Sequence, residues 1–209
     1  MTSFDRAPFL AACDVIDWQS DALRGVAVRL ASGAAGLDVI SILFNWVRDS
    51  IAHTGDLGRG KVTLRASEVF RERTGLCYAK SHLLVALLRA TNIPAGLCYQ
   101  RLRSGEGPTS FVLHGLVGVL MPDQRFLRVD PRGNKPGINA QFTYGREALA
   151  FAANLPGEAD FPGVFARPIP AVVAALSGAR NWHPVETKLP DVRPEHWPAA
   201  DAEWSVPAG

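Results

Sequence analysis

The most constraining feature of this sequence is a long apolar segment, LCYAKSHLLVALLRA, which runs from about Leu76 to Ala90. Its apolar side chains recur at helical spacing and cover more than half of the circumference of a helix. They are Ala79, Leu83, Leu84, Ala86, Leu87 and Leu88. Asn92 and Pro94 end the segment, because asparagine favours a left-handed cap and proline disfavours helical backbone before it. The segment therefore predicts a central, mostly buried helix that the rest of the chain surrounds.

The patterns before and after this segment differ in kind. Apolar residues at helical spacing come before it, and alternating apolar residues come after it. The predicted helices cover 20–30, 37–51, 67–73 with Ser67 as its cap, about 145–153, and 168–178. The predicted strands cover 96–103, 111–120 and 125–130. Helices followed by an antiparallel sheet are typical of an α+β fold and not of alternating βαβ units.

Composition excludes several classes of protein. The 209 residues include 22 Lys and Arg against 20 Asp and Glu, which gives a formal net charge of +2. Nucleic acids and acidic membranes bind clustered positive charge, so neither is an expected partner. No run of about 18 apolar residues is present to span a membrane. The N-terminal MTSFDRAPFLAACDVIDW has charges where a signal peptide needs an apolar core, so we expect a cytoplasmic protein.

The three cysteines, Cys13, Cys77 and Cys98, are odd in number and too far apart for a disulfide framework. No CxxC or HxxxH pattern accompanies them, so we expect no metal site and no cofactor. Thiols stay free in a reducing compartment, where a cysteine can act as a nucleophile.

Cys77 stands where a helix activates a thiol. It follows Gly75 and opens the apolar helix, so it faces the positive end of the helix dipole and unpaired backbone N–H groups. These favour the thiolate and can hold an oxyanion that develops beside the sulfur. His82 lies about 140° further round the same helix, so its side chain diverges from the sulfur. His114, in the middle of a predicted strand and followed by Gly115, is the better candidate for the base.

Asp130 is the expected partner of His114, because an imidazole base needs a group that sets its tautomer. Side chains alternate along a strand, so the two residues share a face only if the loop between their strands has an odd number of residues. With a Pro122–Gln124 loop, Asp130 sits opposite Leu116, one diagonal step from His114. An even loop without a bulge would place them on opposite faces.

Three stretches resemble the transglutaminase-like superfamily, and more closely its bacterial transglutaminase-like cysteine proteases. They are RTGLCYAKSHLLVALLRATNIPAG, LHGLVGV and RFLRVDPRGNK, and the resemblance covers about residues 37–136. It implies a papain- or transglutaminase-like α+β fold, in which helices pack against an antiparallel sheet and the nucleophilic cysteine opens the central helix. It also implies that Cys77, His114 and Asp130 form a Cys-His-Asp triad.

Two positions depart from the family pattern. Ala79 stands where an acidic residue is common, and Leu116 stands where an aromatic residue is common. The triad is retained, so these departures bear on substrate preference. Two other features are expected to be structural: Lys80 is solvated or paired at the helix start, and the Arg101–Arg103 run is a solvated strand edge.

The implied activity is thiol-dependent acyl transfer on an amide bond, by a hydrolase of the cysteine protease or amidase type. A transglutaminase or another acyltransferase with an amine acceptor is the first alternative. A non-catalytic binding module on the same fold is the second. The expected partner is a peptide, a protein or a small amide substrate, and the sequence leaves the oligomeric state and the side-chain oxyanion donor open.

Two regions are expected along the chain. Residues 1–183 form the transglutaminase-like catalytic domain, with its core in 37–136. Residues 184–209 form a proline-rich C-terminal extension, which Trp197 and Trp204 anchor on the domain. Either this extension or the Gly55–Gly60 loop could cover the cleft.

Overall fold

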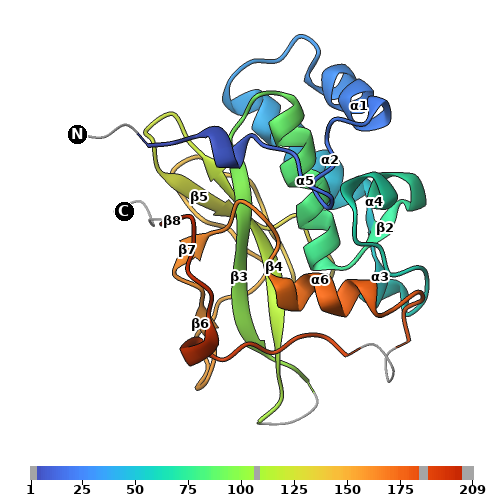
Figure 1. Ribbon diagram of the computed structural model, residues 1–209, viewed down its shortest axis with the longest axis vertical. Helices are drawn as coiled ribbons and strands as arrows, with labels where there is room; N and C mark the ends of the chain where they lie inside the picture. The colour runs from blue at the N-terminus through green and yellow to red at the C-terminus, as the bar shows by residue number, and fades with distance from the viewer. Residues whose placement is uncertain (1–3, 106–108, 184–187, 204–209) are drawn as a thin grey trace.

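The computed structural model describes residues 4–105, 109–183 and 188–203, and Figure 1 shows how their helices and strands are arranged. The helices are α1 (Asp21–Ala31), α2 (Leu37–Ser50), α3 (Thr54–Leu57), α4 (Ala66–Glu72), α5 (Cys77–Ala90) and α6 (Pro170–Ser177), with short 3-10 turns at Ala7–Phe9 and Pro194–His196. The strands are β1 (Ala52–His53), β2 (Thr74–Gly75), β3 (Ala95–Arg103), β4 (Phe111–Leu120), β5 (Phe126–Val129), β6 (Ala159–Asp160), β7 (Gly163–Val164) and β8 (Ala202–Glu203). The main sheet has the order β5-β4-β3-β6 with antiparallel neighbours, which confirms the predicted α+β class.

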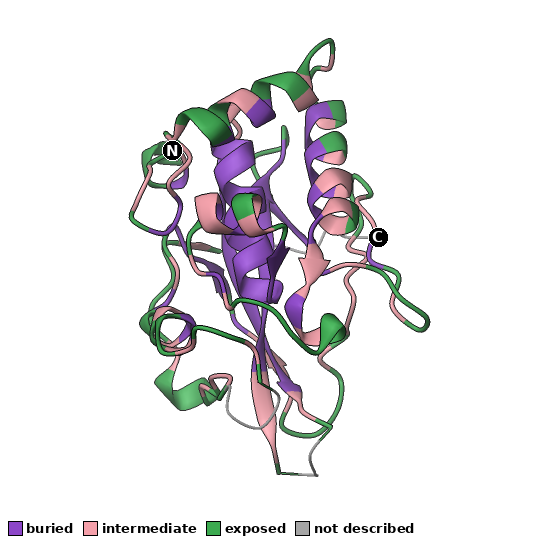
Figure 2. Cartoon of the chain, turned by 90° about the vertical axis from the view of Figure 1, so that its right-hand side faces the viewer, coloured by how far each residue is buried: buried purple, intermediate pink, exposed green. Residues whose placement is uncertain are grey.

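Helix α5 lies at the centre of the molecule. Every residue from Cys77 to Arg89 is buried, and Figure 2 shows the helix surrounded by other elements. Helices α1, α2 and α4 and strands β3 and β4 all pack against it. Asn92 follows the helix in the left-handed conformation, with φ 61°. The prediction of a central buried helix is confirmed, and the burial includes polar side chains that the apolar pattern did not cover.

Lys80 shows how α5 accommodates such a side chain. It is fully buried, so of the two expected states, solvated or paired, the solvated one is wrong. Its ammonium donates to the carbonyl oxygens of Arg48 at 3.1 Å and of Ile51 at 2.5 Å, at the C-terminal end of α2. Burial lowers the pKa of Lys80 to about 7, against the charge of Asp130, which raises it. These hydrogen bonds fasten the end of α2 to α5 one turn after Cys77.

The register between β4 and β5 decides whether His114 and Asp130 can meet. Val117 pairs with Val129 in the antiparallel ladder. Continuing this register places Leu116 opposite Asp130, as the sequence predicted. The predicted register is therefore confirmed, and the side chains of His114 and Asp130 lie on the same face.

A smaller core covers the face of β3 and β4 that points away from α5. Cys98 of β3 lies in it, whereas its neighbours Leu97 and Tyr99 belong to the main core, because side chains alternate along a strand. Its members are Phe9, Cys98, Leu116, Leu120, Phe126, Val164 and Ala166. Cys98 is thus surrounded by apolar side chains.

Residues 145–153 form no helix, which corrects the sequence prediction. Their polar groups bond to the end of the sheet instead. Glu147 pairs with Arg128 of β5 at 2.7 Å, and the backbone N–H of Ala150 donates to Asp130 at 3.1 Å. These tertiary partners override the helical pattern of the segment.

Two local assignments also differ from the prediction. Ser67 lies inside α4 and its hydroxyl donates to Asp17, so it does not cap the helix. The Glu68 carboxylate instead accepts from the backbone N–H of Arg65 at 3.1 Å. The Gly55–Gly60 loop is entered through the single turn of α3.

Residues 188–203 of the C-terminal extension run along the domain. The carbonyl oxygen of Pro190 accepts from the backbone N–H of Leu113 at 2.8 Å, beside His114 on β4. Asp191 binds the Arg101 guanidinium, with Oδ1 2.5 Å from Nε. Arg101 is therefore buried, and the prediction of a solvated edge is wrong for this residue.

Trp197 is a second contact of this extension with the domain. It stacks on Phe161 with 4.2 Å between the ring centroids. Trp204, the other residue expected to anchor the extension, lies outside the described residues. The boundary between residues 183 and 184 stays a prediction.

Candidate active site

Cys77 is fixed by contacts on both sides of its position at the start of α5. Just before it, the parallel strands β1 and β2 pair His53 with Gly75. Gly75 has no room for a side chain, since a Cβ there would meet that of Ala79 at 3.0 Å. The Cys77 sulfur accepts a hydrogen bond from the backbone N–H of Gly115 at 3.5 Å. Strand β4 and the segment before α5 thus hold the sulfur at the first turn of the helix.

His114 and Asp130 meet as their register requires. Nε2 of His114 lies 2.8 Å from Oδ2 of Asp130, whose side chain is fully buried. The same carboxylate accepts from the backbone N–H of Arg132 at 3.0 Å and of Ala150 at 3.1 Å. Since Nε2 faces Asp130, Nδ1 is the His114 nitrogen left for its hydrogen bond with the Cys77 sulfur. The structure therefore brings all three predicted residues together.

These contacts set the charges of the site. Burial disfavours the thiolate, but the charge and hydrogen bond of His114, with those of His53, outweigh it and lower the pKa of Cys77 to about 6. Burial likewise opposes the imidazolium, but Asp130 and Cys77 raise the pKa of His114 to about 10. The pKa of Asp130 is lowered despite its burial, chiefly by the charge of His114. A thiolate beside an imidazolium is thus the favoured state near neutral pH.

His53 is part of the site although it was not among the residues predicted from the sequence. Its ring is hydrogen-bonded to the Cys77 sulfur and lines the same cavity. The pairing of β1 with β2 brings it there, and strands of two residues leave no periodicity to detect. The sequence signal that could have found it is a histidine two residues before the glycine-rich Gly55–Gly60 loop.

An ion cluster joins the loop after His53 to the loop after Asp130. Oδ1 of Asp56 lies 2.8 Å from Nη2 of Arg132 and 2.6 Å from Nζ of Lys135. Burial opposes the Asp56 carboxylate, but these hydrogen bonds lower its pKa to about 2. The cluster therefore holds together the two loops that carry His53 and Asp130.

The three residues Cys77, His53 and His114 line a cavity of about 620 Å³. Much of the remaining wall is apolar. Its apolar members include Leu76, Leu102, Val112, Leu113, Phe151, Leu155, Trp182 and Leu189. Gly55 and Leu189 both belong to the lining, so the glycine-rich loop and the C-terminal extension each border the cleft.

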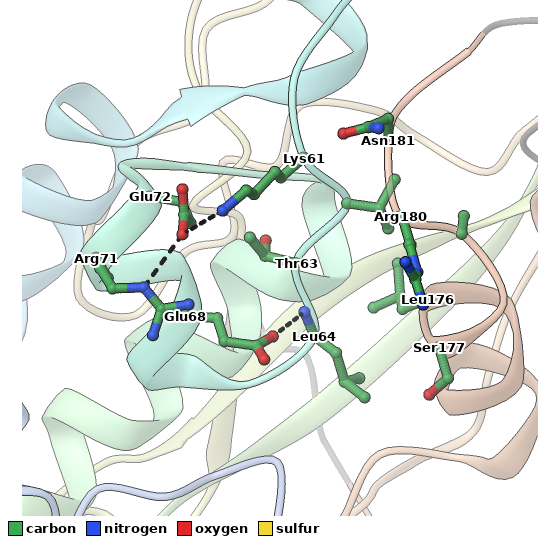
Figure 3. Close-up of a pocket in the computed structure, with 12 residues that line it drawn as sticks. Lys61, Thr63, Leu64, Glu68, Arg71, Glu72, Leu176, Ser177, Arg180 and Asn181 are labelled. Carbon is green, nitrogen blue, oxygen red and sulfur yellow. Dashed lines mark hydrogen bonds and ion pairs between the residues drawn. The ribbon is translucent and has the colours of Figure 1, made fainter.

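A second cavity, of about 500 Å³, lies between α4 and the end of α6 (Figure 3). Its acidic groups already have partners. Glu72 pairs with Lys61 at 2.9 Å and with Arg71 at 3.1 Å, and Glu68 accepts from the backbone N–H of Leu64 at 3.1 Å. No cysteine or histidine is among the described residues that line it. The cavity that contains Cys77 is therefore the candidate active site.

Within residues 4–105, 109–183 and 188–203, no group of three or more His, Cys, Asp or Glu side chains converges as a metal ion would require. None of the helices in these ranges is both long and apolar enough to cross a bilayer.

The chain belongs to the transglutaminase-like superfamily, because the model of that family matches residues 24–131, which is more than half of the chain. This match contains Cys77, His114 and Asp130 and confirms the resemblance seen in the sequence motifs. No curated protein sequence matches the chain.

Several solved structures are similar to this chain. One is a "Putative Cysteine Protease" from Cytophaga hutchinsonii, with 19% identity and a TM-score of 0.49 over 60% of this chain and 41% of that chain. Another is the periplasmic domain of TgpA from Pseudomonas aeruginosa bound to ethylmercury, with 22% identity and a TM-score of 0.47 over 62% of this chain and 50% of that chain. The chain thus spans half or less of the length of these structures.

Proposed function

We propose that the protein is a thiol-dependent amide hydrolase of the cysteine protease or amidase type. Cys77 is its nucleophile, His114 its base and acid, and Asp130 the residue that orients His114. One observation carries the proposal: contacts run unbroken from Asp130 through His114 to a sulfur at the first turn of a buried helix. A cysteine that only fills space in a core needs no histidine and carboxylate in line with it.

The first half of the reaction forms an acyl-enzyme. The Cys77 thiolate attacks the carbonyl carbon of the amide, and a C–S bond forms as the carbonyl oxygen becomes negative. The backbone N–H of Cys77, which has no partner within the helix, can donate to this oxygen. The C–N bond then breaks, and the proton on His114 Nδ1 goes to the departing amine. A thioester on Cys77 remains.

The second half releases the acyl group. The now neutral His114 takes a proton from a water molecule, whose oxygen attacks the thioester carbon. The C–S bond breaks, the carboxylic acid leaves and Cys77 returns to a thiolate beside the protonated His114. Asp130 stays ionised throughout and favours each charged state of the imidazole, which explains why its carboxylate accepts three hydrogen bonds.

An acyltransferase is the second candidate, and the largely apolar wall of the cavity favours it. An apolar cleft slows the approach of water and leaves room for an amine to attack the same thioester. The polar residues of the same wall, among them Asp56 and Arg132, favour water instead. Both reactions share the acylation step, so they differ only in what attacks next.

Acylation by p-nitrophenyl acetate tests the shared step. We expect a burst of p-nitrophenol and an acetyl group on the Cys77 peptide, read by mass spectrometry. Cys13 is the internal control, because it is a partly exposed thiol outside the cavity. If Cys13 were acetylated and Cys77 were not, the result would contradict the proposal and favour the non-catalytic binding module.

Decay of the acetylated protein separates the two candidates. Loss of the acetyl group at a rate that added glycinamide does not change identifies a hydrolase. Faster loss, with acetylglycinamide as the product, identifies transfer to an amine.

A further inference from the structure

We propose that His53 is a further catalytic residue of this site, whose Nε2–H donates a hydrogen bond to the oxyanion that forms beside Cys77. The inference rests on the proposed function and assigns the side-chain donor that the reaction needs. It is carried by where His53 sits, by which of its nitrogens is already occupied, and by the room left around its ring.

The backbone places His53 next to the nucleophile from a separate part of the chain. Strand β1 runs parallel to β2 and pairs His53 with Gly75, directly before the start of α5. The side chain is only 12% exposed, lines the cavity and is hydrogen-bonded to the Cys77 sulfur. Gly55 keeps space for the ring, because a Cβ there would lie 3.1 Å from Cε1 of His53.

The partner of Nδ1 decides what the other nitrogen can do. The backbone N–H of Asp56 donates to Nδ1 of His53 at 3.3 Å, so Nδ1 is an acceptor and the proton of the neutral ring is on Nε2. One carboxylate oxygen of Asp56, Oδ2, lies 3.6 Å from Nδ1, while the other, Oδ1, binds Arg132 at 2.8 Å and Lys135 at 2.6 Å. His53 thus has its Nε2–H available for the sulfur.

The two histidines beside Cys77 are therefore built for different tasks. His114 has a carboxylate behind it, which stabilises an imidazolium that can give and take a proton. Nδ1 of His53 instead accepts the backbone N–H of Asp56 at 3.3 Å, and the Asp56 carboxylate lies further away, at 3.6 Å, so Nε2 is the nitrogen left to donate. A donor of this kind supports charge that appears only in the transition state.

A donor aimed at the resting sulfur is also close to the later oxyanion. When the acyl carbon bonds to sulfur, its oxygen lies one bond beyond that carbon, within the reach of a ring that already contacts the sulfur. The first turn of α5 supplies the backbone N–H of Cys77 from its own side. His53 then completes a pair of donors, one from the main chain and one from a side chain.

Two reagents that attack the same sulfur test this role. Iodoacetamide is displaced at a saturated carbon and forms no oxyanion, whereas p-nitrophenyl acetate forms a tetrahedral oxyanion. Both rates at Cys77 are measured up to the pH plateau, where the sulfur is fully a thiolate and a shift in its pKa no longer contributes. The variants are His53→Phe, which removes the donor, and His53→Gln, which restores an N–H group.

We expect His53→Phe to lower the plateau rate of acylation about 100-fold while the plateau rate of alkylation changes only a few-fold. We expect His53→Gln to recover a large part of the loss in acylation. His196→Phe is the matched control, because His196 is exposed and lies outside the cavity, and both of its rates should equal those of the unchanged protein. Circular dichroism and thermal melting establish that each variant is folded.

Each contrary result has one meaning. An equal fall of both rates in His53→Phe overturns the inference, since His53 would then act on the sulfur or on the fold. Normal acylation in both His53 variants also overturns it, while the proposed function stands as long as Cys77 of the unchanged protein is acylated. Absence of acylation at Cys77 in the unchanged protein defeats the proposed function and the inference with it.

Discussion

Cys77 and Cys98 are both buried free thiols, yet their surroundings drive them in opposite directions. Cys98 lies among apolar side chains on the far face of the sheet, and burial raises its pKa far above the ordinary value of a thiol. Cys77 is buried too, but His114 and His53 lower its pKa to about 6. The sulfur of Cys77 opens into a cavity, whereas Cys98 lines none of the described cavities.

The difference shows that burial alone does not decide what a cysteine does. Removing a thiol from water always disfavours its charged form. Only fixed groups that bind the thiolate can reverse this effect, and the fold supplies them to Cys77 from three separate segments: β1, β4 and the start of α5. Cys98 has the same side chain on a regular strand and receives none of these partners.

The largest effect should come from removing each sulfur in turn. We expect Cys77→Ala to lower the acyl-transfer rate about 10⁴-fold or more, because no other group replaces the nucleophile. Cys98→Ala should leave the rate unchanged within about twofold, because Cys98 does not reach the cleft. Release of p-nitrophenol beyond the first turnover measures both. Equal losses in the two variants would remove the functional distinction between the two cysteines.

The next effect concerns the charge behind His114. We expect Asp130→Asn to lower the acyl-transfer rate about 100-fold or more, because a neutral amide stabilises the His114 imidazolium less than a carboxylate does. The amide also has one acceptor oxygen, whereas the carboxylate uses two. The pKa of Cys77 should rise in this variant while Cys98 is unaffected. Release of p-nitrophenol measures the rate, and ultraviolet absorbance of the thiolate against pH measures the pKa of Cys77. An unchanged Cys77 titration would disconnect Asp130 from the thiolate.

The pH dependence of alkylation compares the two thiols within one sample. With a pKa of about 6, Cys77 is mostly thiolate at pH 7, about 30-fold more so than an ordinary thiol with a pKa of about 8.5. Its reaction with iodoacetamide should therefore rise through pH 6 and level off, while Cys98 stays unreactive in the folded protein. Turnover should fall again as pH approaches 10, where His114 loses the proton that the leaving amine needs. A Cys77 profile that rises only above pH 8 would contradict the proposed ion pair.

The features that the sequence predicted correctly depend on local rules. The apolar run at helical spacing was sufficient for α5, and the loop length between β4 and β5 was sufficient to place His114 and Asp130 on one face. The helix start at Cys77 followed from Gly75 and the pattern after it. Each of these inferences used only neighbouring residues or a single turn.

The features that the sequence did not predict depend on contacts between distant segments. Residues 145–153 form no helix because Glu147 pairs with Arg128 of β5. Arg101 is buried because it pairs with Asp191 of the C-terminal extension. His53 joined the site through a pairing of two very short strands. No periodicity marks such contacts, because they are set by how the elements pack and not by the pattern within them.

The smallest effect should appear in stability, where substitution of Cys98 should cost more than substitution of Cys77. A hydroxyl at position 98 would be buried among apolar side chains without a partner, so we expect Cys98→Ser to lower the free energy of unfolding by about 1–3 kcal/mol. For a chain of this size each kcal/mol lowers Tm by about 2–4 °C. Cys77→Ser should change Tm less, because Gly115, His114 and His53 already offer hydrogen bonds at that position.

Thermal melts of both variants measure the difference, and Cys98→Ala separates the cost of the unpaired hydroxyl from the loss of the sulfur. If Cys77→Ser proved the more destabilising variant, the sulfur at the cleft would hold the fold together and the contrast between an active and a structural thiol would fail.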